Sequence, residues 1–552
     1  MNTQASHTVC KRAFVATVAL LLISSLSINL IISSDVPSDT PDKLAIIAHP
    51  NFVDTMNIWS LERLRDWHNE NDTVVAYIEN TTAVLMNSSF HVDGFWGDGN
   101  VSNPFWRPEE DPITNLGLFN DTQAIIRNYI RYANCKLNVR YVLLVGDEEE
   151  IPTRRLTADG YGAPADIMDL IYYANVPSHL YYACLDGTFN DDEDFNTDSN
   201  EVSGWGENAT HNNDHNFDEV DWNYEVAVGR ITPDDTEELS NIVRKTIAYM
   251  ETSSQDSRLR KVALAGHHLG FGEAAEWGIN FAEQLANRSC SDWNHVTYGF
   301  DRSIYQYIYV NANPVHPDDH LEYLDDTVRS VFNEGIHIWY QCGHGSPTQW
   351  HNNGYGDTWD TIDVSTLENS FYPLVYGALP CLSGQWDTGD CLSEVFVNDE
   401  HGAFASIMNS GYGWGSYNNL HSTSQYIGRE FFDSYFNEGH ARLGDMLFDA
   451  IRDCDWLRNQ SNGAIRWACF DQNLIGNPAV QMRLPRNPDQ PLPGDVDGDS
   501  DVDIFDIIII VNCYGSDMGD PEYIEACDLN DDGKISIFDI VIAAQNYGLR
   551  RS

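Results

Sequence analysis

The amino-acid sequence predicts an α/β protein followed by a small all-α unit. Short apolar runs alternate with helical patterns between residues 43 and 484, which is typical of a parallel sheet with crossover helices. After a Pro-rich segment at 485–494, the chain repeats itself, because 503–508 and 536–541 have nearly the same residues. We therefore expect a linker at 485–494 and a separate helical unit at 495–549.

Each apolar run of the first part has the length and composition of a buried strand. Strands are predicted at 43–48, 73–78, 141–147, 225–230, 261–266, 336–340, 373–379 and 403–408. Apolar residues at helical spacing predict helices at 57–67, 123–133, 234–250 and 276–285. An acidic segment at 186–221 separates two rounds of this alternation. We expect a first α/β subdomain at 43–230 and a second at 231–484.

The composition is strongly acidic, with 84 Asp and Glu against 31 Lys and Arg, and a net charge of −53 in 552 residues. This balance argues against nucleic acid as a partner, because phosphate recognition needs basic side chains. It also argues against docking on an anionic membrane. The eleven cysteines contain no C-x-x-C pair, so a zinc site is not expected.

The N-terminal residues 1–34 have the pattern of a targeting segment. Lys11 and Arg12 precede an apolar run at 13–32, which fits either a cleaved signal peptide or a retained signal anchor. Either alternative predicts export to the cell surface or the medium, and membrane attachment only if the segment is retained. Glycosylation sequons fit export and occur at Asn71, Asn80, Asn87, Asn100, Asn120 and Asn208.

The C-terminal repeat predicts two calcium sites. A twelve-residue calcium loop supplies oxygen ligands from positions 1, 3, 5, 7, 9 and 12. In the first repeat these positions are Asp495, Asp497, Asp499, Asp501, Asp503 and Asp506. In the second they are Asp528, Asn530, Asp532, Lys534 (through its carbonyl), Ser536 and Asp539. Gly533 suits the sharply turned sixth position better than Ser500 does, so we expect the second site to bind more tightly.

This tail resembles a dockerin over about residues 493–549. Two Asp-terminated loops, each followed by an Ile-rich helix, carry the resemblance. It implies an all-α, calcium-binding domain that binds a cohesin-type scaffold protein.

A second acidic series lies in the segment that separates the two subdomains. Oxygen-bearing side chains recur at every second position, at Asp192, Asp194, Asn196, Asp198 and Asn200. The series fits either a further cation site or a solvated acidic loop.

Two residues that can perform nucleophilic chemistry follow consecutive predicted strands. His344 lies directly after the strand at 336–340, and Cys381 directly after the strand at 373–379. Reactive residues collect at the carboxyl ends of parallel strands, so these two side chains are expected to lie side by side. A thiol nucleophile needs such an imidazole. The alternative is a structural cysteine and a turn histidine.

Residues 43–484 resemble a gingipain-type cysteine peptidase of the caspase-like superfamily. Short motifs that follow the family's order carry the resemblance, at 141–147, 181–186, 225–230, 343–346, 390–394, 409–414 and 476–478. It implies a caspase-like parallel-sheet sandwich in two subdomains, protein or peptide substrates, and structural calcium in the catalytic unit. It also implies His344 as general base, Cys381 as nucleophile, and an oxyanion hole from the amides of Cys381 and Gly345.

The sequence departs from this family where a glutamate should orient the catalytic histidine. His267 and His268 occupy that place and the next acid is Glu273, so His268 and Glu273 are the candidates for the third position. The acid that gives the family a basic P1 preference has no clear match, so this preference is not transferred. Trp414 matches loosely an aromatic wall of the substrate pocket, although core packing would explain a tryptophan equally well.

Three functions remain open from the sequence. An exported cysteine endopeptidase tethered by its dockerin is favoured. A catalytically inactive surface protein with the same fold is the first alternative. A dockerin-bearing polysaccharide hydrolase is the second, and it would require two opposed carboxylates on a cleft.

Overall fold

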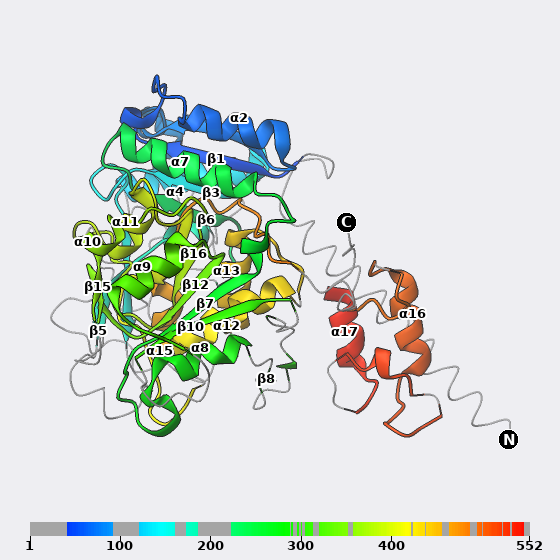
Figure 1. The fold of residues 1–552 in the computed structure, drawn as a ribbon. Helices are drawn as coiled ribbons and strands as arrows, with labels where there is room; N and C mark the ends of the chain where they lie inside the picture. Colours follow the sequence, from blue (N-terminus) through cyan, green and yellow to red (C-terminus); the bar gives the residue numbers. More distant parts are fainter. Residues whose placement is uncertain are drawn as a thin grey trace.

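A computed structural model gives the fold (Figure 1). It describes residues 41–91, 121–159, 173–185, 222–286, 289–290, 295–296, 300, 304–312, 320–351, 357–420, 423–436, 438–454, 463–485, 494–499, 501–521, 523–529 and 533–545. The predicted targeting segment and the acidic series lie outside the described residues. So do Asn100, Asn120, Asn208, Ser500, Asn530 and Asp532.

One 11-stranded sheet carries both halves of the α/β part. Its order is β11-β10-β7-β12-β16-β17-β18-β6-β3-β1-β2. The strands are β1 (Lys43–Ala48), β2 (Val75–Asn80), β3 (Val139–Val145), β6 (Ala227–Ile231), β7 (Lys261–Gly266), β10 (Gln306–Asn311), β11 (Leu321–Glu322), β12 (Ile338–Cys342), β16 (Leu374–Gly377), β17 (Ala405–Asn409) and β18 (Gln472–Ile475). All eight predicted strands are present, and the mostly parallel α/β class is confirmed.

The sheet changes direction once, at β18. This strand pairs antiparallel with β17 and parallel with β6, while every other pair in the sheet is parallel. The strands of 43–231 therefore run opposite to those of 261–409. Sequence reasoning missed β18, because it is short and begins with the polar Gln472 and Asn473. The reversal leaves the carboxyl ends of β7, β12, β16 and β17 at one edge.

Helices cover both faces of the sheet (Figure 1). The longer ones are α2 (Leu61–Asn71), α4 (Thr122–Leu137), α7 (Thr236–Met250), α8 (Gly278–Ala286), α9 (Asp325–Asn333), α11 (Leu392–Asn398), α12 (Thr423–Phe436), α13 (Leu443–Asp453) and α15 (Gly463–Asp471). The helix predicted at 57–67 begins only at Leu61, because Ser60 has an extended backbone. Ile58, which had suggested an earlier start, is 77% exposed.

Successive residues of one strand belong to separate hydrophobic cores on the two faces of the sheet. In β1, Leu44 and Ile46 belong to the hydrophobic cluster that also includes residues of α2, α7, α8, α12 and α13, whereas Ala45 and Ile47 belong to the cluster that includes residues of α4 and α15. A third core joins Trp339 of β12 to α9 and α11. Side chains of one strand alternate between faces, so this division produces a layered sandwich with helices on each side. No helix among the described residues has the length and apolar character to cross a membrane.

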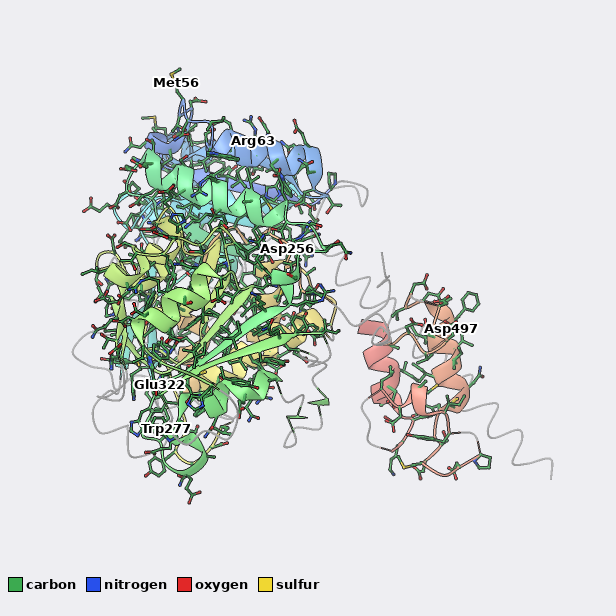
Figure 2. The ribbon with its side chains drawn as sticks, in the orientation of Figure 1. Met56, Arg63, Asp256, Trp277, Glu322 and Asp497 are labelled. Atoms are coloured by element: carbon green, nitrogen blue, oxygen red, sulfur yellow. The ribbon has the colours of Figure 1, made fainter. Side chains whose placement is uncertain are left out.

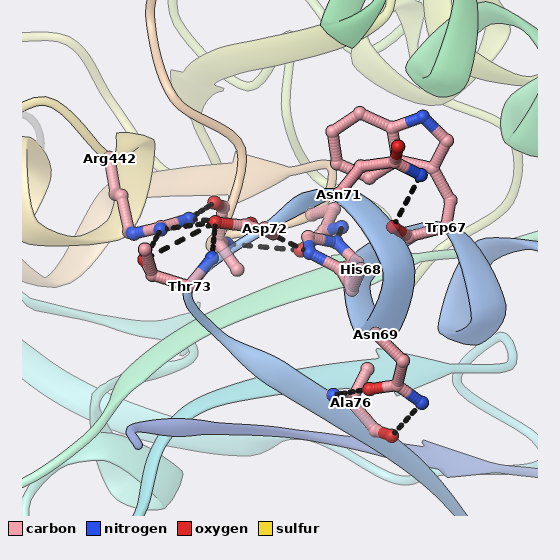
Figure 3. A network of polar contacts seen from close by, with 10 residues as sticks. Trp67, His68, Asn69, Asn71, Asp72, Thr73, Ala76 and Arg442 are labelled. Atoms are coloured by element: carbon pink, nitrogen blue, oxygen red, sulfur yellow. Dashed lines mark hydrogen bonds and ion pairs between the residues drawn. The ribbon is translucent and has the colours of Figure 1, made fainter.

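A buried ion-pair network joins the N-terminal part of the chain to α13 (Figure 3). Arg442 contacts both Asp72, at 2.6 Å, and the hydroxyl of Thr73, at 3.0 Å. The other carboxylate oxygen of Asp72 lies 2.9 Å from Nδ1 of His68, whose Nε2 is 3.0 Å from the Asn477 amide. Burial alone would raise the pKa of Asp72, but the hydrogen bonds from His68 and Arg442 outweigh burial and lower it.

The C-terminal tail forms two helices, α16 (Ile504–Cys513) and α17 (Ile537–Gln545). They share a small core that includes Ile507, Ile510 and Ile540. Asp503 begins α16 as its N-cap and accepts from the amide of Phe505. Asp497, labelled in Figure 2, lies in the loop before this helix.

Candidate active site

His344 and Cys381 lie beyond the carboxyl ends of neighbouring strands. β12 and β16 pair in parallel, with Ile338 opposite Leu374 and Gln341 opposite Gly377. His344 follows β12 by two residues in β13 (His344–Ser346), and Cys381 follows β16 by four. Both residues are half-buried. The register therefore brings the imidazole and the thiol to the same edge of the sheet.

The two loops are in direct contact at Gly345. A methyl group added there would lie 2.5 Å from Oγ of Ser383, 2.7 Å from Cβ of Pro380 and 2.9 Å from the carbonyl oxygen of Cys381. Only a residue without Cβ allows this approach. Ser383 also donates to the carbonyl of Ser346, at 3.3 Å. The glycine predicted to help form an oxyanion hole thus lies against the cysteine loop.

A backbone carbonyl holds the His344 ring. Nε2 of His344 lies 3.0 Å from the carbonyl oxygen of Leu269, in the loop that follows β7. A carbonyl can only accept, so Nε2 carries the proton and Nδ1 of the neutral ring keeps its lone pair. The ring is therefore fixed in the tautomer that can accept a proton at Nδ1.

The two candidates for the third catalytic position, His268 and Glu273, lie in the same loop as Leu269. Nε2 of His268 pairs with the carboxylate of Glu276, at 2.9 Å. Glu273 is exposed, and its φ of 41° lies in the region that non-glycine residues avoid. Trp277, labelled in Figure 2, directly follows Glu276 at the end of this loop. The Leu269 carbonyl contacts the His344 ring, and the role of His268 or Glu273 as a third catalytic residue stays a prediction.

Two aromatic rings flank the His344 imidazole. His351 lies directly opposite His344 in the β13–β14 hairpin (β14, Gln349–His351), and their rings stack at 5.7 Å with an interplanar angle of 11°. Phe271 presents an edge at 6.1 Å and 80°. The imidazole is therefore confined by two rings as well as by its hydrogen bond to Leu269.

The cysteine loop has a strained and heavily bonded backbone. Leu382, directly after Cys381, has φ of 60°, which is costly for a side chain of this size. The buried amide of Asn409 donates to the carbonyls of Ala378 at 3.2 Å and Pro380 at 3.0 Å. The Leu382 amide donates to the carbonyl of Gly411 at 2.7 Å. These bonds hold the turn that presents the thiol.

Burial favours the neutral forms of both reactive groups. It raises the pKa of the Cys381 thiol to about 11. Burial is also the main cause that lowers the pKa of His344, with smaller contributions from His351 and His268. At neutral pH the pair is therefore a thiol and an uncharged imidazole. A thiol in this state has to give up its proton before or during attack on a carbonyl.

Other candidate residues of the site are placed as follows. The Cys381 amide donates to no carbonyl of the described residues, but it contacts the thiol of the same residue. Trp414 is only 3% exposed and packs on Trp467 at 5.2 Å, which is core packing. The exposed ring of the same loop is that of Tyr417, 52% exposed. Tyr417 therefore has more surface available to a ligand than Trp414 has.

The tail brings part of the predicted calcium ligands together. Carboxylate oxygens of Asp495, Asp497 and Asp499 lie within 4.8 Å of one another. Asp506 accepts from the amides of Val496 at 2.8 Å and Asp503 at 2.7 Å, which closes the first loop. In the second loop the Asp539 carboxylate accepts from the amides of Leu529 at 2.7 Å and Ser536 at 2.6 Å. These bonds join the two ends of that loop.

Further described positions of the second loop agree with this geometry. Gly533 has φ of 79°, as the sharp turn requires. Asp528 accepts from the amide of Gly533 at 2.8 Å. Asp501 and Lys534 also lie in the described loops. Clustered carboxylates of this kind are the hard oxygen donors that calcium prefers, so the residues present fit the ion.

Sequence reasoning missed two contributors to the site. Leu269 acts through a carbonyl, and backbone groups leave no residue-type signal in a sequence. His351 was missed because the Pro347-Thr348 connection lacks the Gly or Asn residues that mark a two-residue hairpin.

Comparisons with known proteins agree with this architecture. The model of peptidase family C25 matches residues 37–483, and that of the type I dockerin domain matches residues 493–545. No curated protein matches. A solved structure described as a protease is similar with a TM-score of 0.51 at 17% identity, covering 80% of this chain and 79% of the other.

The Arg-specific cysteine proteinase gingipain R is similar with a TM-score of 0.50 at 15% identity, covering 81% of this chain and 80% of the other. At such identities these likenesses concern the fold alone. The family match extends over most of the chain, from before β1 to the residues after β18. The chain therefore belongs to peptidase family C25 and carries a type I dockerin domain at its C-terminal end.

Proposed function

We propose that the protein is a cysteine endopeptidase in which Cys381 attacks the peptide carbonyl and His344 transfers the proton. One observation carries the proposal. The loop of His344, whose ring is fixed by the Leu269 carbonyl, packs without a gap on the loop of Cys381 at Gly345. A thiol, an oriented imidazole and backbone amides on one sheet edge are the groups that acyl transfer requires.

The geometry supports a general-base mechanism. Nδ1 of His344 accepts the proton of the Cys381 thiol while sulfur attacks the substrate carbonyl. The amides of Cys381 and Gly345 stabilise the oxyanion, and the imidazolium then protonates the leaving amine. Water, activated by the same imidazole, hydrolyses the thioester. The hydrogen bond to Leu269 keeps the ring in one orientation while its charge changes.

The tail would tether this enzyme through calcium and a protein partner. Asp495, Asp497, Asp499 and Asp506, with their counterparts around Asp528 and Asp539, would hold calcium. The bound ion would neutralise the crowded carboxylates and fix the loops before α16 and α17. A cohesin-type scaffold protein is the partner that this domain class suggests, with the enzyme secreted or held at the cell surface.

An active-site probe tests the proposal. A peptidyl acyloxymethyl ketone should label Cys381, and His344→Ala should abolish the labelling. Cys342, a fully buried thiol in β12, serves as the internal control and should stay unlabelled in the folded protein. Labelling that is absent, or that persists unchanged in His344→Ala, would favour an inactive relative with the same fold.

A further inference from the structure

Two thiols of the dockerin tail are in contact and take no part in the proposed chemistry. Cys513 is the last residue of α16, and Cys527 is the last residue of a short helix, η5 (Glu525–Cys527). Their sulfur atoms lie 3.9 Å apart. Both side chains are buried in the tail core, with 5% of Cys513 and none of Cys527 exposed.

We propose that Cys513 and Cys527 form a disulfide that cross-links the two calcium-loop units of the tail. In a disulfide the sulfurs are about 2 Å apart, so each thiol needs to move by about 1 Å. Such a shift is within the reach of rotation about the two Cα–Cβ bonds. The Gly515 amide, two residues after Cys513, donates to the carbonyl of Ile535 in the second loop at 2.8 Å, so the end of α16 is already held against that loop.

The position of Cys527 links this cross-link to calcium binding. Cys527 directly precedes Asp528, the first ligand position of the second loop. Tyr523 donates to the Asp528 carboxylate at 2.6 Å from the other side of η5. A bond to α16 would therefore fix the start of the second calcium loop. It would also restrict the unfolded tail, whose core is too small to add much stability by itself.

The reaction is a thiol–disulfide exchange with an oxidant of the disulfide class, such as oxidised glutathione or an oxidised oxidoreductase. The two S–H bonds of Cys513 and Cys527 break and one S–S bond forms between them. The S–S bond of the oxidant breaks, and its two sulfurs take up the electron pair and both protons. Because the folded tail buries both thiols, the exchange precedes folding around calcium.

Mass spectrometry of the full-length chain tests the disulfide. The Cys381→Ala variant is used to prevent self-digestion, so the result does not depend on the proposed peptidase activity. The chain is treated with chelator and oxidised glutathione, returned to calcium, denatured, and alkylated without reduction. We expect Cys513 and Cys527 in one cross-linked fragment, each alkylated only after reduction. Cys342, whose sulfur lies 3.7 Å from Oε1 of Gln425, should be alkylated throughout.

Two outcomes would overturn the proposal. One is full alkylation of Cys513 and Cys527 without reduction, and the other is a separate glutathione adduct on each. A thermal measurement adds a second test. Reduction should lower the melting temperature of the calcium-loaded tail by roughly 10 °C, and the same reductant should have no effect on Cys527→Ser. Equal shifts in both proteins would also contradict the cross-link.

Discussion

Two different kinds of neighbour, a backbone carbonyl and a second histidine ring, determine the tautomer and the charge of the His344 side chain. The Leu269 carbonyl fixes its tautomer, whereas the parallel ring of His351 acts on its charge. Among the causes that lower the pKa of His344, burial is the largest, and His351 adds to it because a second positive charge nearby disfavours protonation. The imidazole is therefore kept neutral and able to accept a proton.

Replacing His351 should move the acid limb of the pH profile. His351→Phe keeps a flat ring against His344 but removes the charge, so the pKa of His344 should rise. Activity that needs the neutral base would then be lost at higher pH. We expect the acid limb of kcat/KM to shift upward by roughly half a pH unit, since like charges within about 6 Å disfavour protonation. Peptide hydrolysis measured between pH 4 and 8 checks this.

The matched variant His351→Ala separates charge from stacking. It also removes the charge, so the limb should shift at least as far, because exposure of the His344 ring to water raises its pKa as well. The kcat should fall because the ring loses a neighbour. An unshifted limb in both variants would mean that His351 does not act on the base.

At the scale of elements, the site depends on two loops that touch. The loops after β12 and β16 meet at Gly345, where no space remains for a side chain. The side-chain amide of Asn409, at the end of β17, donates to two backbone carbonyls of the loop after β16 and so holds that loop in place. Three neighbouring strands therefore define the separation between imidazole and thiol.

Gly345→Ala should separate the loops without unfolding the protein. The new methyl group would lie 2.5 Å from Ser383 Oγ and 2.9 Å from the Cys381 carbonyl, so the loops must move apart. A displacement of about 1 Å between reacting groups can reduce the rate about a hundredfold. We expect a loss of kcat of that order with an unchanged circular dichroism spectrum. Ser383→Ala, which adds no atom, is the control and should cost much less.

The tail loops should act as a folding switch. Five carboxylates of the first loop repel one another without a cation, and the two helices share only a small core. We expect the isolated segment 493–552 to be largely unfolded in chelator and helical in calcium, with the second site tighter because Gly533 suits its turn. Circular dichroism during a calcium titration measures this. Equal helicity with and without calcium would contradict it.

Much of this architecture could be predicted from the sequence, because apolar runs and turn residues report local structure directly. The strands that carry the site, the order of His344 and Cys381, and the paired loops of the tail were all readable in this way. The reversal at β18 was not, because its polar first residues form their bonds to distant segments. The Leu269 carbonyl was not, because a backbone group has no residue signature.

At the scale of the whole molecule, the network of Asp72, His68 and Arg442 joins residues that are far apart in the sequence (Figure 3). The Asp72 side chain is 9% exposed, and that of Arg442 is 8% exposed. Removing one partner of a buried ion pair leaves the other charge without compensation. The network is therefore expected to stabilise the packing of the segment between α2 and β2 against Arg442 and Asn477.

Asp72→Asn should destabilise the peptidase unit by about 3 kcal/mol, measured by denaturant unfolding. The folded-state pKa of Asp72 is lowered, so its contribution is complete above the unfolded value of about 3.9 and is lost as pH falls below it. The variant should accordingly be less sensitive to acid between about pH 5 and pH 2. Asp66→Asn, in the exposed pair with Arg65, should cost less than about 1 kcal/mol. Equal effects of the two variants would contradict the role of the network.

The central claim is that Cys381 is the nucleophile of a peptidase. The most direct measurement is hydrolysis of a peptide library by the wild-type chain and by Cys381→Ala, with folding monitored by circular dichroism. The account predicts cleavage by the wild type and its complete loss in a variant with an unchanged spectrum. Full activity of Cys381→Ala would contradict the account.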